Sequence, residues 1–219
     1  MVKTNEYYLG LDEVNLIVAA AKNLKESVIL KILAGTGMRR FELANLMVKD
    51  VDFERKRLFI AHGKGHSPEK PKSRAVPIDE DLVQTIKFYL DGRRTGFLIQ
   101  SNKKSFEGIS LSQINRIVTN AAKRAKISNP NPQLKNINPH IFRHSFVRIS
   151  LANGIPFNAV QKIVGHMDAR TTLQMYGQAS FDDVQEIYNA KLAGLFSQKP
   201  KKNNAKLSQF SDKTQSDNI

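Results

Sequence analysis

The sequence predicts a mainly α-helical domain with a small antiparallel β-hairpin or sheet, an α+β architecture. Apolar residues recur at helical spacing over most of the chain, and Gly and Pro mark the ends of these stretches. Only two short segments, residues 57–62 and 75–78, have the composition of paired strands. The 219 residues, 41% of them hydrophobic, are sufficient for one domain with a sizeable core.

The N-terminal part is predicted to form three helices. Apolar residues at helical spacing indicate the first over residues 11–21 and the second from about residue 25. The second helix should end at residues 35–37, GTG, because two glycines favour a turn over a helix. A short third helix follows and carries Arg39 and Glu42.

The middle of the chain is predicted to form strands, because β-prone residues replace the helical pattern there. The predicted strands 57–62 and 75–78 are joined by residues 63–74, a long loop rich in Gly, Pro and Lys. A helical pattern returns over residues 79–90, and residues 97–100 are predicted to form a brief strand.

The C-terminal half is predicted to be helical again. Asn138 is typical of a helix N-cap and Pro139 of a first helical position, so a helix should run from Pro139 to about residue 153. Four further helices are expected over residues 111–125, 156–164, 169–175 and 181–196. The last of these has a capping-box-like start at Ser180 and Asp183. Residues 197–219 are polar, basic and poor in apolar side chains, and are predicted to be a disordered tail.

The charge of the chain indicates a polyanionic partner. Lys and Arg number 34 against 20 Asp and Glu, a formal net charge of +14. The excess is concentrated in residues 111–180, which contain nine basic side chains and one acidic one. A solvated surface normally mixes both signs, so this stretch favours contact with nucleic acid.

Several classes of protein are disfavoured by what the sequence lacks. Without Cys there are no disulfides or thiolate metal ligands, and the longest apolar run, residues 16–21, is far shorter than a membrane span. No secretory leader is recognisable, so we expect a soluble cytoplasmic protein that does not contact membranes. No carboxylate cluster, nucleotide-binding glycine motif or third ligand beside His62 and His66 is present, so neither cofactor nor metal is predicted.

Individual residues give weaker signals. His140 and Arg143 lie three apart on one helix, hence on the same face, while Ile141, Phe142 and Phe146 can face the core. This pattern favours a groove lined by His140 and Arg143. The alternative is that His140 merely starts the helix and Arg143 is solvated.

The other candidates are equally modest when taken singly. Arg39 begins a helix after a glycine turn, and Glu42 could orient its guanidinium or form an ordinary surface ion pair with it. His166 follows the helix end at Gly165, and Tyr176 could be a core aromatic. The joint order of these residues is much more informative than any one of them.

That joint order resembles the catalytic domain of the tyrosine recombinase family (phage integrases and Xer-like enzymes). Residues 36–43, TGMRRFEL, match its first motif, and residues 63–65, GKG, with 74–78, RAVPI, match its β-hairpin. Residues 140–144, HIFRH, match its His-x-x-Arg-His box. Gly165-His166 match its Gly-His box, and Tyr176 matches the tyrosine that follows this box. The resemblance covers residues 10–196 and implies the tyrosine recombinase catalytic-domain fold.

The resemblance also implies roles for individual residues. It makes Arg39 and Arg143 the phosphate-binding arginines, Lys64 the hairpin lysine and Tyr176 the nucleophile. His140 and His166 become the two assisting histidines. The hairpin loop is longer than in typical relatives, so Lys70 or Lys72 could serve in place of Lys64.

The resemblance implies that residues 1–196 are the catalytic domain, and we expect no counterpart of the family's usual N-terminal DNA-clamping domain in these residues. The implied partners are double-stranded DNA and further copies of the chain, assembled as a tetramer on DNA. In relatives the C-terminal segment docks on a neighbouring protomer, so residues 181–219 are expected to do so. The alternative is that this segment packs on its own chain.

The implied chemistry is cleavage and rejoining of DNA without metal or ATP. A tyrosine oxygen attacks a phosphodiester, the arginines stabilise the negative charge of the transition state, and a 3′-phosphotyrosyl bond conserves the energy for rejoining. The function expected is therefore site-specific DNA recombination, as by an integrase. Alternatives are a nicking–closing activity like that of type IB topoisomerases, or a DNA-binding regulator on the same fold that has no catalytic activity.

Overall fold

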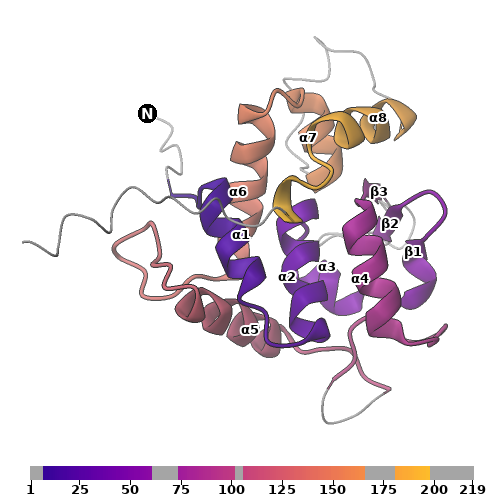
Figure 1. Ribbon diagram of the computed structural model, residues 1–219, viewed down its shortest axis with the longest axis horizontal. Coiled ribbons are helices and arrows are strands. Elements are labelled where there is room, and N and C mark those ends of the chain that lie inside the picture. The colour runs from indigo at the N-terminus through magenta and orange to yellow at the C-terminus, as the bar shows by residue number, and fades with distance from the viewer. Residues whose placement is uncertain (1–6, 61–73, 102–105, 166–180, 198–219) are drawn as a thin grey trace, which may run out of the picture.

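The computed structural model describes residues 7–60, 74–101, 106–165 and 181–197 (Figure 1). Within these ranges the protein is mostly helical, with one three-stranded antiparallel sheet. The predicted α+β architecture is therefore confirmed. No helix in the described ranges combines the length and apolar character needed to cross a bilayer.

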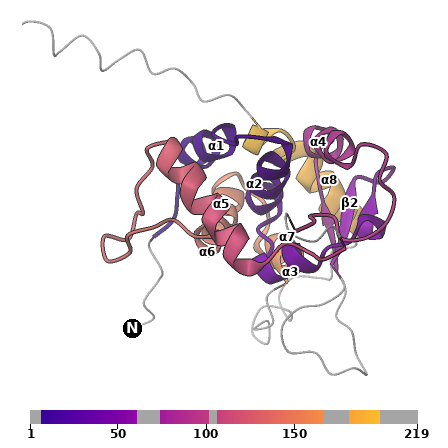
Figure 2. The same ribbon diagram turned by 90° about the horizontal axis from the view of Figure 1, so that it is seen from below.

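Helix α2 (Leu24–Thr36) is the centre of the fold. It packs against α1 (Leu11–Ala19), α4 (Glu80–Leu90) and α6 (Pro139–Ala152). Its buried residues lie on all sides of the helix, as expected for a helix that is enclosed by neighbours. Figure 2 shows α5 (Leu111–Arg124) and α6 on one side of α2, and α4 with the sheet on the other.

The sheet lies at one edge of the molecule. Strand β2 (Arg57–Ile60) pairs with β3 (Arg74–Pro77) as predicted and also with β1 (Val51–Asp52), which follows the short 3-10 helix η1 (Val48–Asp50). Strand β1 was not predicted from the sequence, because two residues are too few to show an alternating pattern. In the β2–β3 register Ile60 lies opposite Arg74, and this pairing fixes the position of Arg74.

The strand predicted over residues 97–100 is not formed. Phe97 and Gln100 make only isolated bridges, to Met47 and Gly108 respectively. The segment is apolar because it is buried in the core, with Leu98 fully buried, and not because it belongs to a sheet.

Helix boundaries in the C-terminal half follow the predicted signals. The Asn138 side chain caps α6 by accepting hydrogen bonds from the backbone N–H groups of His140 and Ile141, and Pro139 occupies the first turn. Helix α7 (Phe157–Val164) ends at Gly165, whose φ of 67° is left-handed. Both predictions are confirmed. The predicted helix 169–175 and Ser180 lie outside the described residues.

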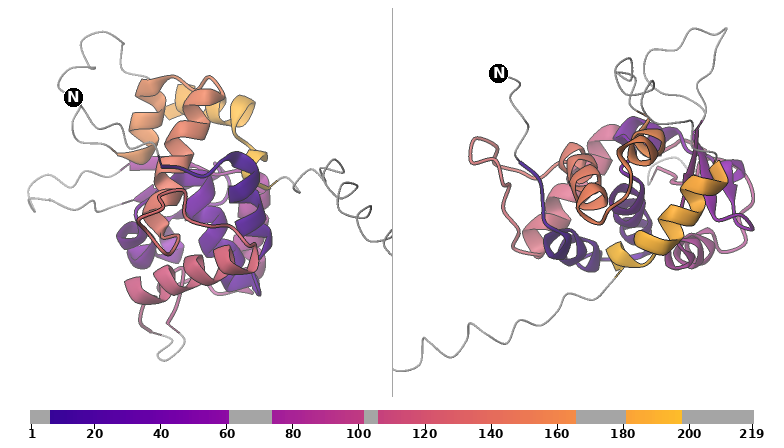
Figure 3. Two further views of the ribbon diagram at one scale, coloured as in Figure 1. Left: turned by 90° about the vertical axis from the view of Figure 1, so that its left-hand side faces the viewer. Right: turned by 90° about the horizontal axis from the view of Figure 1, so that it is seen from above.

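The C-terminal segment packs on its own chain within the described residues. Helix α8 (Phe181–Lys191) contacts β3, and the 3-10 helix η2 (Leu195–Ser197) contacts α1 and α2 (Figure 3). The Tyr188 hydroxyl donates to the Gly35 carbonyl, and the buried Phe196 ring stacks on Phe146. The expectation that this segment docks on a neighbouring protomer is thus wrong for α8 and η2, because their apolar residues complete the core of the same chain.

Candidate active site

The turn between α2 and α3 (Arg40–Asn45) positions the first candidate arginine. Gly37 ends α2 with a φ of 59°, and a Cβ at this residue would lie 2.7 Å from Cδ1 of Phe146. Both observations require glycine, because a side chain would be strained by the backbone and by the Phe146 ring. The turn makes Arg39 the N-cap residue of α3.

Arg143 extends from α6 toward the same turn. Its Nη1 donates a hydrogen bond of 2.9 Å to the Gly37 carbonyl, whereas its Nη2 is buried and has no partner among the described residues. The residue is 5% exposed, so the interpretation of Arg143 as a solvated side chain is wrong. Burial, and then the charge of Arg39, lower the pKa of Arg143 to about 10, so it stays protonated at neutral pH.

His140 lies one turn before Arg143 and is exposed. Its Nε2 is 2.8 Å from Nε2 of His144, and the two rings meet edge to face at 4.3 Å. Desolvation lowers the pKa of both histidines, and the charge of Arg143 lowers both further. Because one nitrogen of the contact must accept, the geometry and the charges both favour a neutral ring at this site.

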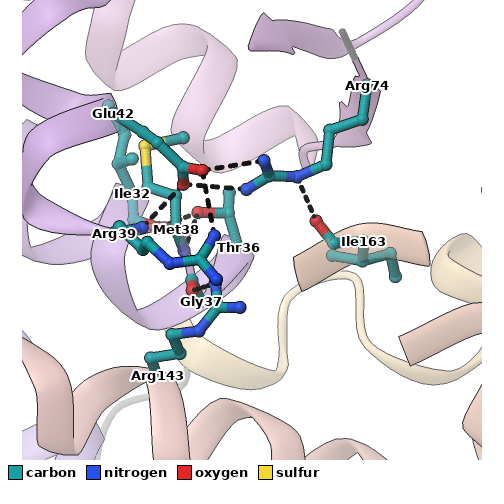
Figure 4. Close-up of polar contacts among 9 residues, drawn as sticks. All are labelled: Ile32, Thr36, Gly37, Met38, Arg39, Glu42, Arg74, Arg143 and Ile163. Atoms are coloured by element: carbon teal, nitrogen blue, oxygen red, sulfur yellow. Dashed lines mark hydrogen bonds and ion pairs between the residues drawn. The ribbon is translucent and has the colours of Figure 1, made fainter. Parts of the chain in front are cut away.

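The only carboxylate in contact with Arg39 within the described ranges is Glu42, and this carboxylate is shared equally with Arg74 (Figure 4). Arg74 donates from Nη1 and Nη2 to the two Glu42 oxygens at 2.8 Å each. The Arg39 backbone N–H donates to Oε2 at 2.8 Å, and its Nη1 lies 3.3 Å from Oε1. Burial by itself raises the pKa of Glu42, but the hydrogen bond and charge of Arg74, with smaller effects of Arg39, bring it below the ordinary value.

A cavity of about 780 Å³ opens between α3, α5 and α6. Arg39, His140 and Arg143 line it, together with an apolar wall and two asparagines: Met38, Phe41, Leu111, Pro139, Asn115 and Asn138. No cluster of three or more His, Asp or Glu suited to a metal ion occurs among the described residues. The lining is positively charged and rich in donors, so it suits an anion such as a phosphate.

Three of the six predicted site residues are therefore brought together: Arg39, His140 and Arg143 line one cavity. Lys64, with its alternatives Lys70 and Lys72, lies outside the described residues, as do His166 and Tyr176.

Sequence reasoning missed two side chains that the structure adds to the site. His144 could have been found, because it lies four residues after His140 and hence on the same helical face. Arg74 was noted only as part of a motif, and nothing in the pattern indicated that it contacts Glu42.

The arrangement of these helices and the small sheet is that of a tyrosine recombinase catalytic domain. The solved structure of the lambda integrase catalytic core superimposes with a TM-score of 0.55 at 18% identity, covering 74% of this chain and 96% of that one. The model of the phage integrase family matches residues 8–183. The chain belongs to this family.

Relatives of higher identity are Xer-type recombinases. Tyrosine recombinase XerA of Pyrococcus horikoshii is 32% identical over 185 residues, which are 83% of this chain and 60% of the relative. The crystal structure of a XerA recombinase matches with a TM-score of 0.63 at 31% identity, covering 84% of this chain and 62% of that one. The chain thus spans about three fifths of the length of these relatives.

Proposed function

We propose that this chain is the catalytic domain of a site-specific DNA recombinase whose substrate is duplex DNA. In the proposed step the Tyr176 oxygen forms a bond to the phosphorus of a phosphodiester, and the bond from phosphorus to the 5′ oxygen breaks. The tyrosine loses its proton and the leaving 5′ oxygen gains one, so a 3′-phosphotyrosyl bond and a 5′ hydroxyl result. Attack by a different 5′ hydroxyl then joins new strands without ATP.

The observation that carries this proposal is the buried Nη2 of Arg143, which lies beside Arg39 and has no hydrogen-bond partner among the residues that the structure describes. A buried guanidinium N–H without an acceptor destabilises the fold, so its retention at a cavity indicates a ligand that accepts hydrogen bonds. The non-bridging oxygens of a phosphodiester fit this requirement, because arginine forks bind them in two-pronged fashion and stay charged.

The remaining roles are proposed from the family motif and from the chemistry of the side chains. His140 has a lowered pKa, so in its neutral form it can accept the proton of Tyr176 or donate a hydrogen bond to the phosphate. We assign a similar role to His166 and assign protonation of the leaving 5′ oxygen to Lys64. Neighbouring arginines favour this last step, because like charges lower the pKa of a lysine.

The environments of other tyrosines support Tyr176 as the nucleophile. The Tyr188 hydroxyl is fully buried, donates to the Gly35 carbonyl and has a raised pKa because of its burial. Burial also raises the pKa of Tyr89. A raised pKa disfavours the phenolate that the attack requires.

A nicked duplex that traps the covalent intermediate tests the proposal. Incubated with a library of such duplexes, the chain should form a covalent protein–DNA complex that disappears in Tyr176→Phe and persists in the matched control Tyr188→Phe. Exchange of strands between two sites would distinguish a recombinase from a nicking–closing enzyme. Binding of duplex without any covalent complex would overturn the proposal in favour of a regulator.

We further propose that the chain acts as a tetramer on DNA. Deleting α8 and η2 would remove buried core residues and disturb the fold. An intermolecular role of the C-terminal segment is therefore tested by deleting residues 198–219 alone. Deleting them should weaken cooperative assembly on paired sites more than binding to a single site, as measured by gel-shift titration. Equal losses in both assays would contradict this role.

A further inference from the structure

We propose that Arg74 is a positioning residue for DNA cleavage: it fixes Glu42, and through Glu42 the phosphate-binding Arg39, to the C-terminal end of α7 without contacting DNA itself. The proposal rests on the proposed function for its effect on cleavage. Its structural part rests only on contacts among described residues, which Figure 4 shows together.

The guanidinium of Arg74 is largely used within the protein. Nη1 and Nη2 each donate to a Glu42 oxygen at 2.8 Å, and Nε donates to the Ile163 carbonyl at 2.8 Å. Three of the five donors of an arginine are thus engaged, and its side chain is 12% exposed. Arg143 has the opposite pattern: within the described ranges it makes one hydrogen bond to the protein, and its buried Nη2 has no partner there. The two arginines therefore differ in role: one binds the ligand and the other organises the site.

Glu42 transmits the position of Arg74 to Arg39. The carboxylate that Arg74 holds also accepts the Arg39 backbone N–H at 2.8 Å and lies 3.3 Å from Arg39 Nη1. The Glu42 side chain is 1% exposed, so water cannot replace the two hydrogen bonds that it would lose without Arg74. It would then turn toward Arg39 or become protonated, and either change would move the start of α3.

The other end of this connection is the last turn of α7. Arg74 bonds Ile163 there, and its guanidinium packs so closely on Gly165 that a Cβ on this glycine would lie 2.9 Å from Nη1. Gly165 immediately precedes His166 in the sequence. One side chain on β3 thus joins the start of α3 to the end of α7, the two places where Arg39 and His166 are attached to the fold.

The test compares Arg74→Gln with Arg124→Gln, because Arg124 makes the same pattern of contacts away from the cavity. Arg124 donates from Nε to the Ala20 carbonyl at 2.8 Å and from Nη2 to Glu26 at 2.5 Å. It lies at the opposite end of α5 from the cavity residue Leu111, about 20 Å along the helix axis. Loss of this junction should reduce stability without altering the site.

Three measurements are made on each variant: the single-turnover rate of covalent complex formation on a nicked duplex, the dissociation constant for that duplex, and the exchange rate of the Arg39 amide by NMR. For Arg74→Gln we expect a rate about 100-fold lower, with the dissociation constant changed by less than about threefold. The Arg39 amide should exchange faster, because its acceptor Glu42 is no longer held. Arg124→Gln should change none of these three quantities.

Arg74→Lys guards against a variant that simply fails to fold. Lysine retains the charge but cannot form the two-pronged contact with Glu42 while bonding Ile163, so this variant should fold and still lose most of the rate. Full activity of Arg74→Lys would overturn the proposal, since charge alone would then suffice. Loss confined to DNA affinity would also overturn it, because Arg74 would then be a DNA contact.

The failure of the proposed function would be recognised separately. If the wild-type chain forms no covalent complex with any duplex, the recombinase assignment fails. The Arg39 amide then decides whether Arg74 organises this site. An exchange rate unchanged in Arg74→Gln overturns the inference, and faster exchange in Arg74→Gln but not in Arg124→Gln supports it.

Discussion

Two charged regions of this protein differ in how their basic side chains are paired with carboxylates. Along α4 and the edge of the sheet, basic side chains are matched with carboxylates: Lys31 with Asp81 at 2.6 Å, Lys56 with Glu80 at 2.9 Å, and Arg57 with Asp52 at 3.0 Å. At the candidate site, as far as the structure describes it, a single buried carboxylate, Glu42, contacts both Arg39 and Arg74, while Arg143 donates to the Gly37 carbonyl.

The difference shows which positive charges are available to a ligand. Two of the matched pairs, Lys31–Asp81 and Lys56–Glu80, each include a carboxylate whose side chain is about half exposed, and such pairs contribute little to stability. In all three pairs the two opposite charges largely cancel, so little field remains around them. At the site burial, and then repulsion by Arg39, lower the pKa of Arg143, and both effects oppose folding with this arginine charged. A protein keeps such an unbalanced cluster where an anion completes it, which is the physical basis of the proposed phosphate site.

The largest effect expected is on stability, from Glu42→Gln. Removing the charge leaves Arg74 buried without its counter-ion, so unfolding by urea should show a loss of about 3–5 kcal/mol. The matched control Asp81→Asn breaks an exposed pair and should cost about 0–1 kcal/mol. Equal losses would remove the distinction between the two regions.

The next effect concerns cleavage. Arg143→Gln removes a donor aimed at the cavity, and the rate of covalent complex formation on a nicked duplex should fall by about 10²–10³-fold. Arg57→Gln, in the matched region, should leave the rate within about threefold of the wild-type value. A similar loss in both variants would mean that general charge, and not the arrangement at the site, determines the rate.

Two helix N-caps, one at the candidate site and one away from it, allow effects on stability to be separated from effects on cleavage. Asn23 caps α2, and Asn138 caps α6 at the turn that carries His140. Replacing either with Ala should destabilise the fold by about 1 kcal/mol in urea unfolding. Only Asn138→Ala should also slow cleavage, because its cap fixes the backbone of His140. Slower cleavage in Asn23→Ala as well would indicate a global effect.

The smallest effect expected is a dependence of stability on pH. Partial desolvation and the charges of Arg143, Arg39 and Arg40 lower the pKa of His140, and desolvation, His140 and Arg143 lower that of His144. Below the ordinary value of 6.5 the unfolded chain therefore binds protons that the folded chain does not, so stability is lost as pH falls below 6.5. Urea midpoints between pH 5 and pH 8 should show this slope, and the double variant His140→Gln, His144→Gln should flatten it.

The sequence predicted helix starts and ends correctly where a single residue type determines the backbone conformation. Asn138 with Pro139 predicted the start of α6, and Gly37 and Gly165 predicted the ends of α2 and α7. The spacing of His140 and Arg143 predicted a shared face, because a helix repeats every 3.6 residues. The misassigned strand at residues 97–100 shows the limit of this reading: a short apolar run is buried in either conformation.

The sequence by itself determined the described helices, the pairing of β2 with β3 and three of the side chains that line the cavity, Arg39, His140 and Arg143, because caps, turns and periodicity are encoded within a few neighbouring residues. Only the tertiary structure decided that Arg143 is buried, with an Nη2 that has no partner in the described part of the chain, and that Arg74 joins Glu42 to Ile163. These contacts connect residues 32 to 106 positions apart. No local pattern records such a contact, because it arises only when separate elements pack around α2.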